Sequence, residues 1–178
     1  MFSEYLLSAK TSNDPISVYT NKNDTDRFSF GFIQDISEEH VLIESVSPLG
    51  FYDGYIIKEK EEIYRIDRMD SYGKKMRKLF SLRQQSHQIV ERKTDNLILN
   101  LMYFANENRL VVTIELFNSG SYDLQGHVGV IQDNVVTIEK LDENGASDGS
   151  SVVSLADITI ISCDSDNEMA LKLLVDNS

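Results

Sequence analysis

The sequence predicts a mainly β protein with helices, made of two tandem β-barrels of five short strands each. The first observation behind this prediction is an internal repeat, because residues 31–66 and 126–161 align without a gap at a constant offset of 126 − 31 = 95. Self-similarity at a fixed offset indicates a repeated structural unit. The identical positions are Gly31/Gly126, Ile36/Ile131, Val41/Val136, Ile43/Ile138, Glu44/Glu139, Gly50/Gly145, Asp53/Asp148, Gly54/Gly149, Ile63/Ile158 and Ile66/Ile161.

The second observation is the period of the apolar residues. Short segments in which apolar and polar residues alternate recur in both copies, and this alternation is typical of half-buried strands. Clusters of Asn, Asp, Ser and Gly separate the segments and favour turns. The expected strands are 16–20, 28–33, 40–46, 55–58 and 62–67 in the first copy, and 110–117, 124–131, 135–141, 151–155 and 158–163 in the second.

Repeated glycines mark the third observation, a hairpin connection at 47–54 that recurs at 142–149. An Asp-Gly pair is a strong signal for a tight turn, because glycine adopts a positive φ without steric cost. We therefore expect a positive φ at Gly54 and at Gly149, the glycines of the two Asp-Gly pairs. The predicted structural turn residues are Gly50, Asp53, Gly54, Gly145, Asp148 and Gly149.

Helical spacing of apolar residues predicts a short helix before each barrel, at 2–11 and 96–105, and a closing helix at 166–174. A longer amphipathic helix at 70–90 is expected to join the barrels. The predicted domains are 1–92, a barrel with a trailing basic amphipathic helix, and 93–178, an acidic barrel.

Charge is distributed unevenly along a chain whose formal net charge is −12. Residues 74–93 carry seven bases and one acid (7 − 1 = +6), whereas residues 123–178 carry two bases and eleven acids (2 − 11 = −9). We expect the joining helix to bury its apolar face between the barrels, with its lysines toward acids such as Asp142, Asp164 or Asp166. The overall negative charge disfavours a nucleic-acid partner, which needs cations along the phosphates.

Compartment is predicted from three features. No apolar run approaches the roughly 18 residues that a membrane-spanning helix needs, so no membrane association is expected. The N-terminus has an acid, Glu4, where a secretion signal carries bases, and Cys163 is the single cysteine, so it cannot form an internal disulfide. These features predict a cytoplasmic protein.

Enzymatic chemistry finds little support in the sequence. His40, His87 and His127 lack neighbours with metal-ligand spacing, and we interpret them as surface or half-buried strand residues. Glu44 and Glu139 are interpreted as solvated residues on outer strand faces rather than as a carboxylate pair. No catalytic residue, cofactor or metal site is therefore predicted.

Candidate binding residues lie in the first copy. The aromatic residues Phe51, Tyr52 and Tyr55 flank its hairpin, whereas the second copy has small residues at these positions. They could bind a partner, or fill the groove between the barrels. Lys74, Lys75 and Lys78 on the basic helix could form a phosphate-binding stripe, or the solvated face of a packed helix.

A short helix followed by five short strands, with a glycine early in the second strand, resembles the Sm-like fold, a small SH3-like barrel. The repeat G-x-I…V-x-I-E-x-V…G-x-x-D-G…I-x-x-I also resembles uncharacterised tandem-barrel proteins of low-GC Gram-positive bacteria. Sm proteins that bind RNA have an Asp and an Asn around the turn between strands two and three. Ser37, Val41, Gln132 and Val136 stand there in this chain, so the resemblance implies the fold without its RNA pocket.

The favoured interpretation is a non-enzymatic cytoplasmic binding or adaptor module, whose partner is another protein or a second copy. One alternative is an RNA-binding protein that uses the basic helix. The other is an enzyme with an unrecognised site between the two barrels.

Overall fold

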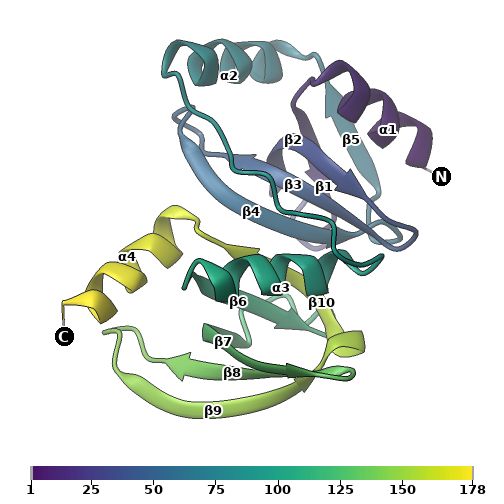
Figure 1. Ribbon diagram of the computed structural model, residues 1–178. Helices are drawn as coiled ribbons and strands as arrows, with labels where there is room; N and C mark the ends of the chain where they lie inside the picture. Colours follow the sequence, from purple (N-terminus) through teal and green to yellow (C-terminus); the bar gives the residue numbers. More distant parts are fainter. Residues whose placement is uncertain (1, 178) are drawn as a thin grey trace. The chain divides into compact units, whose positions relative to one another are not determined.

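The fold was analysed in a computed structural model that describes residues 2–177 (Figure 1). It is mainly β with four α-helices, which confirms the predicted class. The chain divides into two compact units, Met1–Ile89 (unit 1) and Val90–Ser178 (unit 2).

Each unit has the same order of elements, one helix, five strands and a second helix. Unit 1 contains α1 (Ser3–Ser12), β1 (Ile16–Tyr19), β2 (Ser29–Ile36), β3 (His40–Val46), β4 (Tyr52–Glu59), β5 (Arg65–Arg68) and α2 (Ser71–Leu82). Unit 2 contains α3 (Leu97–Glu107), β6 (Val111–Leu116), β7 (Leu124–Gln132), β8 (Val135–Leu141), β9 (Ser147–Ser154), the 3₁₀ turn η1 (Leu155–Asp157), β10 (Ile158–Cys163) and α4 (Asp166–Asp176).

The strand order is also the same in the two units. In unit 1 it is β5-β1-β2-β3-β4, and in unit 2 it is β10-β6-β7-β8-β9, with antiparallel pairing throughout. Within each unit the first and last strands of this order are not hydrogen-bonded to one another. Each unit therefore forms an open antiparallel sheet. The closed barrel that the sequence predicts is not formed by these hydrogen bonds.

Two glycines explain how the second and third strands of each unit cross so closely. A Cβ on Gly31 would overlap the carbonyl oxygen of Glu44, and a Cβ on Gly126 would overlap that of Glu139. Real side chains never approach a carbonyl this closely, so only glycine allows the backbones to meet here. These glycines fix where β2 bends over β3, and β7 over β8.

The Asp-Gly pairs have a different structural role from the predicted one. Gly54 and Gly149 have φ of 65° and 78°, which confirms the expected positive φ. They lie inside β4 and β9, however, and not in the hairpin turns. In each unit the pairing register shifts here, so that Asp-Gly opposes a single residue of the neighbouring strand. The pair forms a β-bulge, in which a left-handed glycine is favoured.

The turns themselves depend on the other repeated glycine. The amide of Gly50 donates to the carbonyl of Ser47 at 2.8 Å, and that of Gly145 donates to the carbonyl of Asp142 at 3.1 Å. Both glycines have positive φ, 78° and 81°. Each turn also packs on a helix, because a Cβ on Gly50 would lie 2.5 Å from Cβ of Leu79 in α2.

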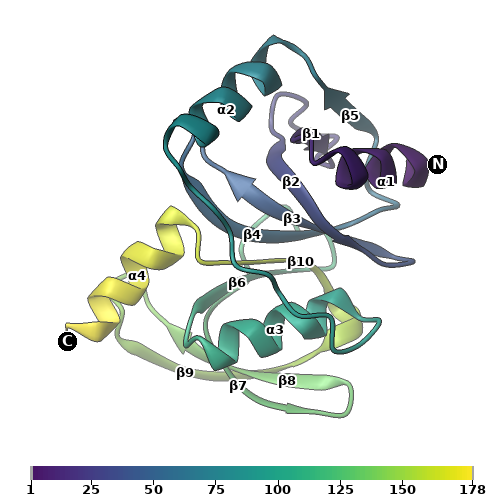
Figure 2. The same ribbon diagram turned by 45° about the horizontal axis from the view of Figure 1, so that its top comes forward.

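Apolar side chains gather on both faces of the unit 1 sheet, because successive residues of a strand point to opposite faces. One cluster packs beneath α1 and includes Leu6, Ala9, Ile16, Val18, Ile33, Val41, Ile43 and Ile63. The other packs beneath α2 and includes Phe28, Phe30, Phe32, Val46, Tyr72, Met76, Leu79 and Phe80. Both helices lie against the strands of unit 1 in Figure 2.

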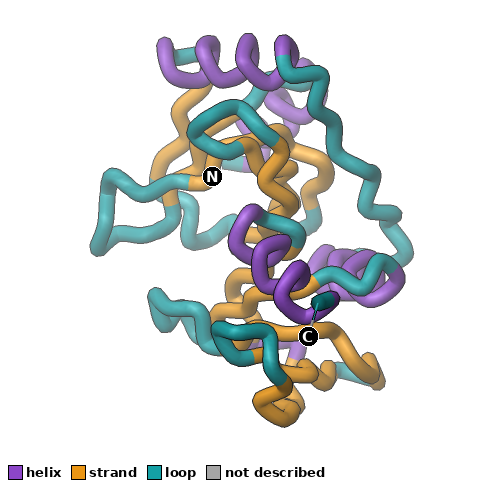
Figure 3. Tube along the Cα trace, turned by 90° about the vertical axis from the view of Figure 1, so that its left-hand side faces the viewer, coloured by secondary structure: helices purple, strands orange, loops and turns teal. Residues whose placement is uncertain are grey.

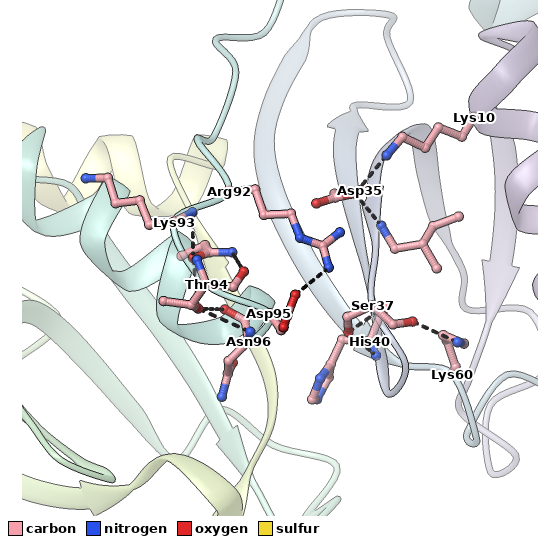
Figure 4. A network of polar contacts seen from close by, with 12 residues as sticks. Lys10, Asp35, Ser37, His40, Lys60, Arg92, Lys93, Thr94, Asp95 and Asn96 are labelled. Atoms are coloured by element: carbon pink, nitrogen blue, oxygen red, sulfur yellow. Dashed lines mark hydrogen bonds and ion pairs between the residues drawn. The ribbon is translucent and has the colours of Figure 1, made fainter.

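Polar contacts join the elements of unit 1 at the edges of these clusters (Figure 4). Lys10 Nζ of α1 donates to Asp35 Oδ1 of β2 at 2.7 Å. Lys60 Nζ donates to the carbonyl of Ser37 at 2.8 Å, and the amide of His40 donates to Ser37 Oγ at 3.0 Å. Ser37 therefore stabilises the β2–β3 turn, and its polar atoms are already used.

The predicted joining helix at 70–90 is wrong in its length and in its packing. It ends at Leu82, because Gln84 has a left-handed φ of 52°, and residues 83–96 form a continuous loop (Figure 3). The apolar face of α2 packs on β2 and β3 of its own unit. Residues 83–89, called the strap below, then follow the helix within unit 1.

Candidate functional site

The outer face of α2 carries the lysines that the sequence singled out. At 100° per residue, Lys74, Lys75, Lys78 and Leu82 fall on one side of the helix, opposite the buried Met76. The Asp70 side chain begins the helix by accepting a hydrogen bond from the amide of Gly73 at 2.7 Å. The three lysines are exposed, and within residues 2–177 none of them forms an ion pair.

The β3–β4 turn places apolar side chains beside this helix. Arg83, at the end of α2, donates from Nε to the carbonyl of Leu49 at 3.0 Å. Its guanidinium carbon lies 3.7 Å from the centre of the Phe51 ring, a cation–π distance. Leu49, Phe51 and Leu82 nevertheless remain 66%, 40% and 69% exposed. We call Leu49, Phe51, Lys74, Lys75, Lys78, Leu82 and Arg83 the α2–turn surface.

The predicted aromatic cluster is divided by the structure. Phe51 lies on the α2–turn surface, whereas Tyr52 is half-buried and Tyr55 is buried. The hydroxyl of Tyr55 donates to the carbonyl of Gln88 at 2.7 Å, so it holds the strap. Tyr55 is therefore a structural residue, and Phe51 is the member of the cluster that a partner could reach.

The side chain of His87 in the strap is buried and lies beside the half-buried Glu44, and sequence reasoning missed this acid–histidine pair. The His87 ring lies under Tyr52, Tyr55 and Phe80, with centroid distances of 4.5, 5.4 and 5.7 Å. Its Nε2 is 2.9 Å from the carbonyl oxygen of Ser45, and Nδ1 is 3.9 Å from Glu44 Oε2. Nδ1 itself has no hydrogen-bond partner among the described residues.

Burial shifts the pKa values of Glu44 and His87 in the directions that favour the neutral form of each side chain. It raises the pKa of Glu44 to about 7, and it lowers the pKa of His87 to about 4 against the opposing effect of the Ser45 and Gly54 carbonyls. At pH 7 the imidazole is therefore neutral. The expectation that Glu44 is solvated is wrong, although Glu139, its counterpart in unit 2, is exposed.

Replacing Glu44 with Gln should reduce the pH dependence of stability. A carboxyl whose folded pKa is raised contributes stability at low pH, and this contribution is lost as the pH rises from about 4.5 to about 7. Between pH 5 and pH 8 the wild type should lose roughly 2 kcal/mol of unfolding free energy relative to Glu44→Gln. Urea denaturation across this range measures the difference.

The matched control for this experiment is Glu139→Gln, because Glu139 occupies the corresponding place in unit 2 and is exposed. Its pH profile should follow that of the wild type. Parallel profiles for the wild type and Glu44→Gln would contradict the burial of the Glu44 carboxyl. His87 gives an opposite contribution, which is lost as the pH falls from 6.5 toward 4.

The chemical possibilities of the two places differ. The His87 side chain is only 1% exposed, so a substrate has no access to its ring. Within residues 2–177, no three His, Cys, Asp or Glu side chains come together in a way that could hold a metal ion. The α2–turn surface, in contrast, offers free cations beside accessible apolar groups, and it is the candidate functional site.

Comparisons with known proteins add no assignment to this geometry. No helix among the described residues is long and apolar enough to cross a membrane. No protein-family model matches the chain, no curated protein matches it, and no solved structure matches it.

Proposed function

We propose that the protein is a non-enzymatic cytoplasmic binding or adaptor module, and that the α2–turn surface binds an acidic segment of another protein. The observation that carries this proposal is the free cationic stripe of Lys74, Lys75 and Lys78 beside exposed Leu49 and Phe51, on a chain whose net charge is −12. Rows of unpaired lysines repel one another and gain nothing from packing. An acidic partner would neutralise the charges of these lysines, so binding such a partner is the function that we assign to them.

The second unit supports this interpretation, because it has the same helix without the same surface. At an offset of 95, α4 carries Met169, Ala170 and Leu173 in place of the three lysines. The turn that packs on α4 carries Asn144 and Ala146 in place of Leu49 and Phe51. The scaffold can therefore form without the α2–turn residues, and the residues are free to serve binding.

The partner is defined by the chemistry of the surface. Lysines at the rim of an interface steer acidic partners and contribute modestly to affinity. An aromatic ring held by an arginine, as Phe51 is held by Arg83, supplies a pre-ordered apolar anchor. We expect an acidic segment that also carries Leu or Phe to bind more tightly than a segment that carries acids alone.

Reversing the three lysines tests the proposal. Lys74→Glu/Lys75→Glu/Lys78→Glu should weaken binding of a 12-residue peptide of alternating Glu and Leu/Phe by about tenfold, or roughly 1.4 kcal/mol. Fluorescence anisotropy at 50 and 200 mM salt measures it. Lys22→Glu, a change at another exposed lysine of unit 1, is the control and should leave binding unchanged.

Two further probes separate the alternatives. A polyglutamate peptide of equal charge should bind more weakly, because it lacks the apolar anchors. A 12-nucleotide RNA that bound more tightly than either peptide would favour the nucleic-acid alternative. If none of the three probes bound, the α2–turn surface would not be a binding site.

The two alternatives are less well supported than the proposal. Val41 and Val136, at the positions of an Sm-type RNA pocket, are fully buried, and Ser37 is used within its turn. An enzyme would need accessible acid–base groups, whereas the His87 ring is buried and the Glu44 side chain is only 20% exposed. The proposed cytoplasmic location is in keeping with Cys163, the single cysteine, being a free thiol.

We also infer that the two units are copies of one Sm-like (SH3-like) scaffold. The inference is supported by the common order of strands and by three pairs of glycines at an offset of 95. Gly31/Gly126, Gly50/Gly145 and Gly54/Gly149 make the same kind of close approach, helix contact or bulge in each unit. An experimental structure in which the units differed in strand order would overturn it.

A further inference from the structure

Strand β9 has one unpaired edge. It stands at the end of the strand order of unit 2, and within residues 2–177 it pairs only with β8 (Figure 1). Its first four residues, 147–150, are exposed, so neither face of the strand is covered there. An edge strand of this kind presents unpaired N–H and C=O groups to another chain.

The phase of the hydrogen bonds shows which groups point outward. The amide of Leu155 donates to the carbonyl of Asn134 at 2.8 Å, just beyond the pairing of Ser154 with Val135. Hydrogen-bonded and non-hydrogen-bonded pairs alternate in an antiparallel ladder. The backbone N–H and C=O groups of Val153 therefore point toward β8. Val152 and Ser154 therefore direct their backbone groups toward the free edge.

The outer face beside this edge is aliphatic. Val152 pairs with Thr137 of β8, and Val130 lies in the β7 bulge opposite the same part of β8. Val130 and Val152 are 67% and 68% exposed. In β4 the position that corresponds to Val152 is Ile57, which is fully buried. An aliphatic residue at this position of the scaffold can therefore be covered completely, and in β9 it is not.

Beyond the bulge at Asp148-Gly149, residues 150–154 of β9 carry no feature that protects an edge. Natural edge strands are blunted by short length, charges, proline or bulges. In unit 1, β5 is four residues long and reads RIDR, so it is both short and charged. In contrast, β9 has eight residues, no proline and no lysine, and its single charge, Asp148, is paired with Lys140 at 2.9 Å.

Charge selects the kind of partner. Unit 2 carries five bases and fifteen acids, 5 − 15 = −10. Two copies of β9 pairing with one another would bring two such units together against their repulsion. A basic segment would instead gain from the same field.

We propose that the free edge of β9 binds an extended cationic segment of a partner protein by strand addition. The partner strand forms main-chain hydrogen bonds with Val152 and Ser154, and an aliphatic side chain of the partner covers Val152. Its alternate basic side chains lie in the negative field of unit 2. This site is independent of the α2–turn surface, because it lies in the other unit and selects the opposite charge.

The test uses the full chain and an eight-residue Lys-Val repeat peptide, with fluorescence anisotropy as the readout. Val152→Pro removes the outward N–H of an edge position where proline is tolerated, and it should weaken binding at least tenfold. Val152→Thr keeps this N–H and is the matched control, which should bind within threefold of the wild type. Thermal unfolding of both variants checks that the fold is kept.

A second arm uses the unaltered chain, so it does not depend on the folding of Val152→Pro. The same peptide with N-methyl groups on alternate residues keeps its charge and loses the amide donors of one edge, and it should bind at least tenfold more weakly. Equal binding of the two peptides would show attraction by charge alone and overturn the proposal. A dimer in sedimentation that Val152→Pro dissociates would also overturn it, because a second copy would then occupy the edge.

Discussion

Gly126→Ala is expected to lower the free energy of unfolding by about 3 kcal/mol or more. The added Cβ would overlap the carbonyl oxygen of Glu139 in the neighbouring strand. This oxygen belongs to the backbone of β8, so it cannot move aside as the end of a flexible side chain can. The strands must separate, and the hydrogen bonds around Gly126 are weakened. Urea denaturation measures the loss.

Gly129→Ala is the matched control, because Gly129 lies in the same strand and a Cβ there would meet its nearest atom, the Thr137 carbonyl oxygen, at 3.3 Å. Its cost should stay below about 1 kcal/mol. Gly31→Ala, the counterpart in unit 1, should behave like Gly126→Ala, since its Cβ would overlap the carbonyl of Glu44. Equal stabilities of Gly126→Ala and Gly129→Ala would contradict the close crossing of β7 and β8.

Asp14→Ala is expected to cost about 2 to 3 kcal/mol, because one carboxylate holds three elements of unit 1 together. Asp14 lies between α1 and β1, and its side chain is 12% exposed. Arg68 at the end of β5 donates to its Oδ2 at 2.8 Å, and Arg77 of α2 pairs with its Oδ1. Without Asp14, the Arg68 side chain, whose Nε already lacks a partner, keeps its charge in a partly buried place.

The pH dependence of this effect follows from the pKa of Asp14. Hydrogen bonds from Arg68 and Ser12 hold the pKa of the carboxyl below its usual value of 3.8. The stabilisation is therefore fully present above the unfolded pKa and is lost as the pH falls through the folded pKa. The difference between wild type and Asp14→Ala should be constant above pH 5 and shrink below about pH 4, as measured by denaturation at each pH.

An exposed ion pair provides the control. Asp176 of α4 accepts from Lys172 at 2.8 Å, at the surface of the same helix. Asp176→Ala should change the free energy of unfolding by less than about 0.5 kcal/mol. If Asp14→Ala were as mild as Asp176→Ala, the three-element contact would not stabilise unit 1.

The repeat explains why much of the fold could be predicted. Strands and turns follow from the local alternation of residues, and the offset of 95 places each signal twice, so a weak signal in one copy is supported by the other. The paired glycines were recognised, but their roles were partly misassigned. Asp53-Gly54 was interpreted as a turn, since a bulge and a turn both require a left-handed glycine, and only the pairing register distinguishes them.

The α2–turn surface was partly predicted. The sequence identified Phe51, because the second copy has a small residue at its position. It also identified Lys74, Lys75 and Lys78, because they lie in a basic segment of an acidic chain. Leu82 is exposed because it lies on the lysine side of α2, opposite the buried Met76. The sequence leaves open whether Tyr55 binds a partner or packs inside the protein, because nothing in the sequence shows that its hydroxyl bonds to the strap.

The sequence by itself determined the two-unit organisation, the strands, the repeated glycines and the uneven charge, because each of these depends on residue types and on their spacing along the chain. Only the tertiary structure decided the partners of Glu44 and His87, the contact of Arg83 with Phe51, and the free edge of β9. The physical reason is that these features join residues without a fixed spacing. His87 lies 43 positions from Glu44 and outside the repeated segment 31–66, so only the folded chain brings the pair together.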